Sequence, residues 1–186
     1  MDGVRLRSFC EGDIPDLLAS WDEQQMRWWS AGPSDEAGAR EWYERRNDWS
    51  DGLHASWAVT DDTDRLLGSV SVHEIVREHA SAQVGYWVSP WARCRGVATA
   101  AVRLAVSHAF SELGLFRVML YHAVENPASC AVARKLGFKL EGTLRQSYRY
   151  GDGQFHDEHL HAVLADEWTT SQRAGSRYAR DRHAPT

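Results

Sequence analysis

The sequence of 186 residues has no long apolar run, no internal repeat and no segment resembling a signal peptide. These absences argue against a membrane-spanning or exported protein. Its three cysteines, Cys10, Cys94 and Cys130, are odd in number and lack metal-like spacing, so we expect a reducing cytoplasm rather than a disulfide framework. The net charge of -5 argues against nucleic acid as the main partner and is compatible with a cationic or amine substrate.

Length and composition are those of an ordinary globular protein. Hydrophobic residues make up 43% of the chain and charged residues 25%, and the length suffices for one domain with a good core. The segment Ser171–Thr186 is polar, rich in arginine and without periodicity. We therefore predict a single domain over residues 1–168 and a flexible tail over residues 169–186.

Tryptophan is abundant, with nine residues, and five of these cluster between Trp21 and Trp49. Large aromatic side chains most often pack in cores. Some could instead line a substrate pocket, where rigid rings bury an apolar acceptor or stack on a cation. Trp29 is our candidate for such a substrate-binding role.

The hydrophobic pattern predicts a mixed α/β domain around a central sheet. The order of elements is β-α-α-β-β-β-α-β-α-β-β. Helices are expected from Ile14, from Ser34 or Asp35 to about Asp48, over Val97–Leu113, and from Asn126 to Gly137. Strands are expected at Val4–Phe9, Gly52–Thr60, Leu66–Val76, Ala80–Ser89 and Phe116–Ala123, followed by a final pair around Gly151-Asp152-Gly153.

The most informative stretch is Gly85–Thr99, which predicts a strand, a tight basic loop and the first turn of a helix. This arrangement brings several backbone N–H groups and the positive end of a helix dipole to one point, which attracts a pyrophosphate. A glycine at position 96 lets the backbone approach a phosphate and can take a positive φ. The candidate cofactor-binding residues of this loop are Arg93, Cys94, Arg95, Gly96, Val97, Ala98 and Thr99.

A second motif lies downstream of this loop. Asn126 is a good N-cap, Pro127 suits the first helical position, and Gly137 is a typical residue just past a helix end. The pattern Asn-x-x-Ser through Leu-Gly-Phe therefore predicts a short helix that places Asn126 and Ser129 at its N-terminus.

The two motifs together resemble the GNAT superfamily of acyl-CoA-dependent N-acyltransferases. Residues 93–98 match the pattern Arg/Gln-x-x-Gly-x-Gly/Ala, and the end of the domain is similar to the RimJ/RimL-like branch, named for ribosomal-protein N-terminal acetyltransferases. The resemblance covers residues 4–168. It implies a mostly antiparallel sheet, flanked by helices, that splays after Val88 and holds the pantetheine arm of the cofactor in the gap. It also implies that Val88 pairs with the pantetheine.

The resemblance implies catalytic roles for a few residues. The N–H group of Val88 is the candidate oxyanion donor, since a tetrahedral intermediate needs such a donor. Many family members carry an acidic tyrosine seven residues after the motif asparagine, but here that position is Ala133. Ser129 is the candidate replacement that hydrogen-bonds the cofactor sulfur and, with Asn126, binds the cofactor. Tyr86 could orient the substrate, although a tyrosine on a central strand is more often a core residue.

The general base is harder to assign. A glutamate is common in this branch two residues before the Gly-Tyr pair, but Gln83 stands there and cannot act as a base. Glu74 and His73 on the preceding strand are the alternatives. Adjacent strand residues face opposite sides, so at most one of them points at the site. We take Glu74 as the candidate base.

A late histidine cluster raises the question of a metal. Asp157, His159 and His161 share one face of a strand, and His-x-His on a strand can bind zinc, with His156 adjacent. No cysteine is close in sequence and the resemblance implies no metal, so we predict none. One of these residues could instead bind substrate or accept a proton.

The resemblance implies a cytoplasmic enzyme that transfers an acetyl group directly from acetyl-CoA to an amine, with no nucleic acid or membrane as partner. A homodimer is plausible. The acceptor could be a protein N-terminus or a small-molecule amine. Two alternatives stay open: the same fold with another acyl-CoA or an aminoacyl-tRNA as donor, and a non-catalytic acyl-CoA-binding module.

Overall fold

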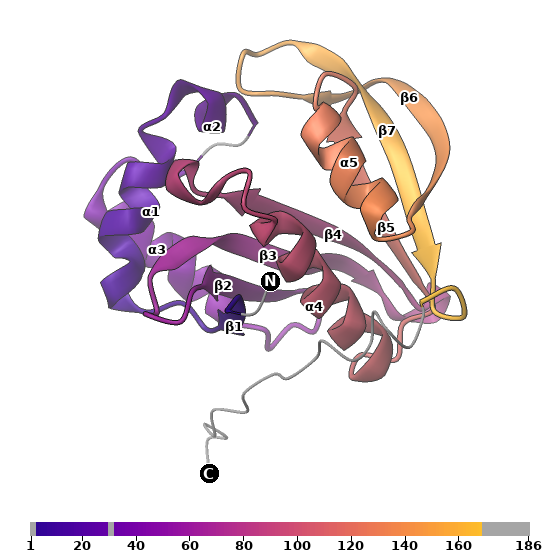
Figure 1. The fold of residues 1–186 in the computed structure, drawn as a ribbon, viewed down its shortest axis with the longest axis horizontal. Coiled ribbons are helices and arrows are strands. Elements are labelled where there is room, and N and C mark those ends of the chain that lie inside the picture. The colour runs from indigo at the N-terminus through magenta and orange to yellow at the C-terminus, as the bar shows by residue number, and fades with distance from the viewer. Residues whose placement is uncertain (1–2, 30–31, 169–186) are drawn as a thin grey trace.

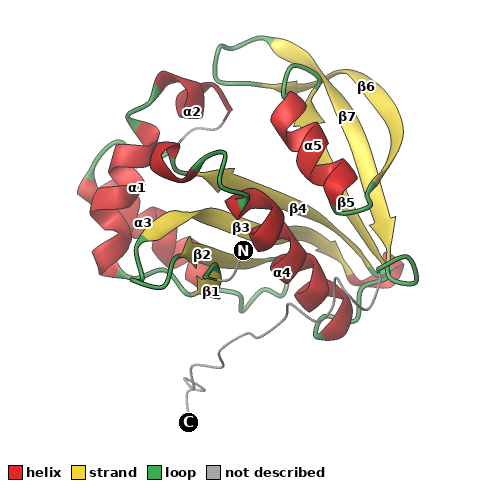
Figure 2. Ribbon diagram, viewed as in Figure 1, coloured by secondary structure: helices red, strands yellow, loops and turns green. Residues whose placement is uncertain are grey.

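Seven strands form one sheet, and helices cover both of its faces (Figures 1 and 2). The computed structural model describes residues 3–29 and 32–168. The sheet order is β1-β2-β3-β4-β5-β7-β6, and every neighbouring pair is antiparallel except β4 and β5. The strands are β1 Arg5–Arg7, β2 Ala55–Thr60, β3 Leu66–Val76, β4 Ser81–Val88, β5 Arg117–Ala123, β6 Lys139–Arg149 and β7 Phe155–Leu164. The helices are α1 Ile14–Trp21, α2 Gln24–Trp29, α3 Glu36–Asn47, α4 Val97–Ser111 and α5 Pro127–Lys135.

The predicted α/β class and mostly antiparallel sheet are confirmed. The bounds of β3 match the expectation, whereas several other elements are shorter by one to three residues at an end. One helix was missed, because α2 is only six residues long and follows α1 after a two-residue break. The tail predicted over residues 169–186 lies outside the described residues.

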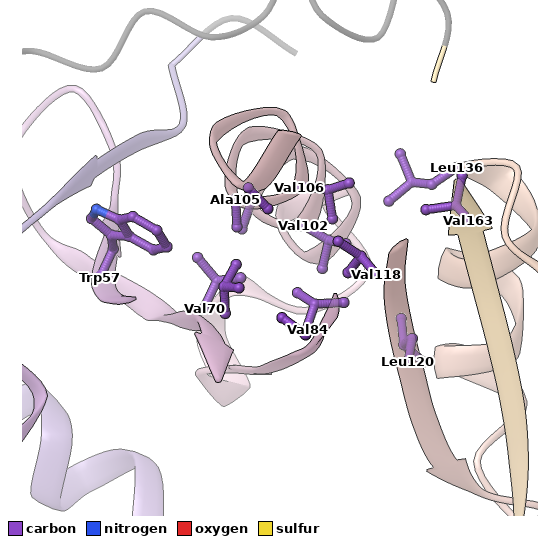
Figure 3. Packing of buried hydrophobic residues seen from close by; sticks show 14 of the residues in the cluster. Trp57, Val70, Val84, Val102, Ala105, Val106, Val118, Leu120, Leu136 and Val163 are labelled. Carbon is purple, nitrogen blue, oxygen red and sulfur yellow. The ribbon is translucent and has the colours of Figure 1, made fainter. Parts of the chain in front are cut away.

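Two apolar clusters hold the helices on the sheet. The larger cluster packs α4 against the central strands, and Figure 3 shows Val102 and Ala105 of α4 facing Val70 and Val84. Alanine and valine recur on one side of α4, so a narrow apolar stripe can approach the sheet closely. The smaller cluster packs α1 and α3 on the opposite face, around Leu17. Each face of the sheet is therefore buried against helices.

The N-terminus of α1 has no side-chain cap. Asp13 directly precedes the helix, but its side chain makes no capping hydrogen bond to α1. Its buried carboxylate instead accepts two hydrogen bonds from the guanidinium of Arg7, each at 2.7 Å, and one from the backbone N–H of Cys10 at 2.9 Å. The Asp13 carboxylate binds the Arg7 guanidinium rather than the backbone N–H groups of α1, because charge-assisted hydrogen bonds are stronger than neutral ones.

The described residues include no helix that is both long and apolar enough to cross a membrane.

Candidate functional site

The two parallel strands at the centre of the sheet separate early. β4 and β5 pair only at Ser81 with Arg117, Ala82 with Val118 and Gln83 with Met119. Beyond these pairs the strands diverge, as Figure 1 shows between β4 and β5. The sequence-based expectation that the sheet splays after Val88 was therefore wrong: the gap already begins after position 83.

The backbone of Val88 faces this gap. The N–H of Ser89 donates to the carbonyl of Leu67 at 2.9 Å, so it points toward β3. Successive N–H groups of an extended strand point in opposite directions. The N–H and C=O of Val88 therefore point away from β3, into the space that β5 has left. This is the direction that a donor to a bound thioester needs.

The basic loop meets the N-terminus of α4 at the same end of the gap. Gly96 is the N-cap of α4 and has a φ of 76°, in the left-handed region that favours glycine. Cys94 also has a positive φ, of 58°, so the loop is tightly bent. No side chain caps α4. The N–H groups of Val97, Ala98 and Thr99 in its first turn are thus available to an anion.

The two arginines of the loop differ in surroundings. Arg95 is exposed beside Gly96. Arg93 is half-buried, pairs with Glu23 at 2.6 Å, and donates from Nε to the carbonyl of Val88 at 3.4 Å. Arg93 therefore ties the loop to β4 and to the segment between α1 and α2, in addition to contributing positive charge.

The opposite wall of the gap is the N-terminus of α5. Asn126 caps the helix as predicted, because its Oδ1 accepts from the backbone N–H of Ser129 at 3.0 Å. The Ser129 hydroxyl also accepts a hydrogen bond from the Tyr86 hydroxyl at 2.9 Å. This bond spans from β4 to α5, and so joins two residues that the sequence analysis selected separately. Ala133, which stands at the position of the usual tyrosine, is fully buried.

Burial holds Tyr86 in its protonated form. Burial raises the pKa of Tyr86 to about 12, while the hydrogen bond with Ser129 opposes this shift. The phenol therefore stays a donor at neutral pH. Because Ser129 accepts from Tyr86, its own hydroxyl hydrogen is free to be donated elsewhere.

A pocket of about 540 Å³ opens beside α2. Its lining combines two carboxylates and two indoles, from Glu23, Gln24, Trp28, Trp29 and Glu125. The predicted substrate residue Trp29 is thus placed on a pocket wall. The other four lining residues were not selected from the sequence: Gln24 and Trp28 lie on α2, Glu23 directly precedes α2, and Glu125 lies between β5 and α5.

Helix α2 is fastened to the turn between β6 and β7. The backbone N–H of Gly151 donates to the carbonyl of Trp28 at 2.8 Å, and the Trp28 indole N–H donates to Asp152 at 2.9 Å. The Trp28 ring stacks on Tyr150 with a centroid distance of 5.0 Å. In Figure 1 α2 reaches across toward the β6–β7 loop at the open end of the sheet. These contacts fix the aromatic wall of the pocket.

Charged groups surround this wall. Buried Glu158 accepts hydrogen bonds from the hydroxyls of Tyr150 at 3.0 Å and Ser147 at 2.9 Å. His156 contacts Asp152 at 2.9 Å and Glu125 at 3.3 Å, and these two carboxylates raise the pKa of His156 above its usual value. The pocket therefore has an acidic rim, which suits a positively charged guest.

The two candidate bases of the sequence analysis lie on β3. Glu74 is exposed, has a φ of 49° at an irregularity of β3, and accepts a hydrogen bond from Gln83. It is not among the residues that line the pocket. His73 lies beside Gly85, and burial lowers the pKa of His73, which favours the neutral imidazole.

These features define an α/β domain with a splayed parallel strand pair, a phosphate-type loop and an adjacent acidic pocket. Residues 4–139 match the family model of the acetyltransferase (GNAT) domain. The match covers well over half of the chain, so the chain belongs to the GNAT family.

Similar individual proteins support the assignment to the GNAT family. It is 37% identical over 55% of its length to "Putative ribosomal N-acetyltransferase YdaF" of Bacillus subtilis, and 32% identical over 56% to the spermidine N(1)-acetyltransferase of Escherichia coli. These matches span 56% and 59% of the relatives, so the chain covers somewhat more than half of their length. The structure of Mycobacterium smegmatis RimJ in complex with CoA-disulfide has the same fold, with a TM-score of 0.82 at 22% identity, covering 93% of this chain and 90% of RimJ. These neighbours agree with the RimJ/RimL-like branch.

Proposed function

We propose that this protein is an acetyl-CoA-dependent N-acetyltransferase that passes the acetyl group directly to a primary amine. The observation that carries the proposal is the hydrogen bond from Tyr86 to Ser129. It spans the gap between β4 and α5, with the open N-terminus of α4 at one end. The acyl donor, acetyl-CoA, is bound through its pyrophosphate, which accepts hydrogen bonds from the backbone N–H groups of residues 94–99.

The thioester lies against β4 in this proposal. The N–H of Val88 points into the gap and donates to the oxyanion that forms when the amine attacks the carbonyl carbon. The carbon–sulfur bond then breaks, and the sulfur leaves as a thiolate. Ser129 donates a hydrogen bond to this thiolate, since its oxygen already accepts from Tyr86.

The acceptor enters through the acidic pocket. Its ammonium form is attracted by Glu125, and the Trp29 ring on the pocket wall provides a cation–π contact. The amine must lose a proton before it attacks. In this proposal the Glu125 carboxylate accepts the proton. Glu125 lines the pocket and directly precedes Asn126 in the chain. A homodimer remains a prediction from the family resemblance.

Release of free thiol from acetyl-CoA tests the proposal, with a panel of polyamines, amino acids and peptides as acceptors. We expect acceptor-dependent thiol release that is slowed by about 10²- to 10³-fold in Ser129→Ala. Parallel titrations with acetyl-CoA and a longer acyl-CoA identify the donor. Micromolar binding without turnover on any amine would overturn the enzymatic proposal and favour the acyl-CoA-binding module.

A further inference from the structure

Three histidines and one cysteine meet beneath α5, away from the acceptor pocket. His122 lies on β5, His159 and His161 on β7, and Cys130 on α5. The register pairs His122 with His159 and places His161 two residues further along the same face of β7. Cys130, 29 residues before His159, completes the group only in the folded chain.

The spacing of these groups is close to that of a tetrahedral metal site. One ligand atom from each of the four side chains lies within 4.8 Å of all the others. The Nε2 atoms of His122 and His161 are 3.2 Å apart. In a tetrahedral zinc site the bond lengths require about 3.3 Å between two nitrogens and about 3.6 Å between nitrogen and sulfur. The Nε2 atoms of His122 and His161 are already about this far apart. Ligand atoms that are up to 4.8 Å apart must come closer by about an ångström or slightly more to reach the tetrahedral separation.

The orientation of His122 suits a metal ligand. Its Nδ1 lies 2.8 Å from the carbonyl oxygen of Ala123, so Nδ1 carries the proton and donates it. Its Nε2 then presents a lone pair toward the cluster. A ligating histidine usually donates its other N–H to a carbonyl or carboxylate in this way.

One imidazole nitrogen of the cluster is unsatisfied. The Nδ1 atom of His159 is buried and has no hydrogen-bond partner within residues 3–29 and 32–168. A buried polar atom of this kind calls for an explanation, and a bound ion is one of the recognised ones.

The cysteine also has a suitable neighbour. Cys130 is 8% exposed, and the guanidinium of Arg134 donates to its Sγ at 2.8 Å. The Cys130 sulfur is therefore buried and held beside the three histidines.

We propose that His122, Cys130, His159 and His161 bind one zinc ion. Three imidazole nitrogens and one thiolate are a zinc-type donor set, and four protein ligands close the site to substrate. Binding releases the thiol proton of Cys130 to solvent. The ion fastens α5 to β5 and β7, and so supports the helix whose N-terminus presents Asn126 and Ser129. The role is structural and does not depend on the proposed acetyl transfer.

The test uses purified protein stripped with a chelator and titrated with Co²⁺, then with Zn²⁺. A single equivalent of Co²⁺ should give tetrahedral visible bands and a thiolate-to-cobalt charge-transfer band, and Zn²⁺ should displace it. Zinc should also raise the melting temperature.

Cys130→Ala should lose the charge-transfer band and the zinc-dependent rise in melting temperature. The matched control is Cys10→Ala, which removes an exposed thiol and should leave both signals intact. If the unmodified protein gives no thiolate–cobalt band at one equivalent, or if the band is lost in Cys10→Ala instead, the cluster is a metal-free group of buried side chains and the proposal fails. The cobalt titration of the unmodified protein decides this even if Cys130→Ala does not fold.

Discussion

Removal of the Ser129 hydroxyl should slow acetyl transfer without unfolding the protein. Ser129→Ala keeps the backbone N–H that Asn126 caps, so α5 retains its N-terminal hydrogen bond. Loss of the bond with Tyr86 costs about 1 kcal/mol of folding stability. Loss of one donor to a developing charge lowers kcat by about 10²- to 10³-fold. The effect falls on kcat more than on KM, because the thiolate charge exists only as the carbon–sulfur bond breaks.

A double-mutant cycle with Tyr86→Phe tests whether the two hydroxyls act together. Tyr86→Phe removes only the donor to Ser129, so we expect a loss of about tenfold in kcat. The double variant should be no slower than Ser129→Ala, since residues that act as one unit are not additive. Thiol release under saturating acetyl-CoA measures kcat, and the control is Ser111→Ala, whose hydroxyl donates to the carbonyl of Ser107 within α4 at 2.8 Å. A fully active Ser129→Ala, or strictly multiplicative losses, would refute this role for the pair.

Three further changes address the helix cap, the base and the pH dependence. Asn126→Ala should lower the stability of the protein by about 1 kcal/mol in urea unfolding, because it removes the cap of α5. Glu125→Gln should lower kcat/KM, while Glu74→Gln should leave it unchanged; the reverse pattern would return the base to β3. The pKa of His156 is raised by Asp152 and Glu125, so the stability it adds is complete below the unfolded pKa of about 6.5 and is lost as pH rises through the folded pKa. The stability difference between the protein and His156→Gln should therefore shrink from pH 6 to pH 9, and a constant difference would contradict this linkage.

Local chemistry made part of this site predictable. Gly96 had to tolerate a positive φ, and Asn126 had to cap a helix that Pro127 begins, so both positions follow from neighbouring residues alone. The alternation of apolar residues likewise predicted β3 with its correct bounds. In these cases the deciding contacts are close in sequence.

Other features depend on contacts between distant residues. Helix α2 is too short to show a period, and it is held by Gly151 and Asp152, more than 120 residues away. Cys130 joins His122 and His161 only because α5 packs on β5 and β7, so the expectation of no metal overlooked a cysteine that is distant in sequence. The start of the gap after Gln83 depends on the pairing of β4 with β5, which no local pattern encodes.

Isothermal titration with acetyl-CoA tests the central claim most directly. The unmodified protein should bind one acetyl-CoA with micromolar affinity. Gly96→Glu should abolish binding, since it forces a side chain into a φ of 76° and places a negative charge at the phosphate loop. Matched unfolding curves establish that the variant is folded. No heat with acetyl-CoA, CoA or a longer acyl-CoA would contradict the assignment of this gap as a cofactor site.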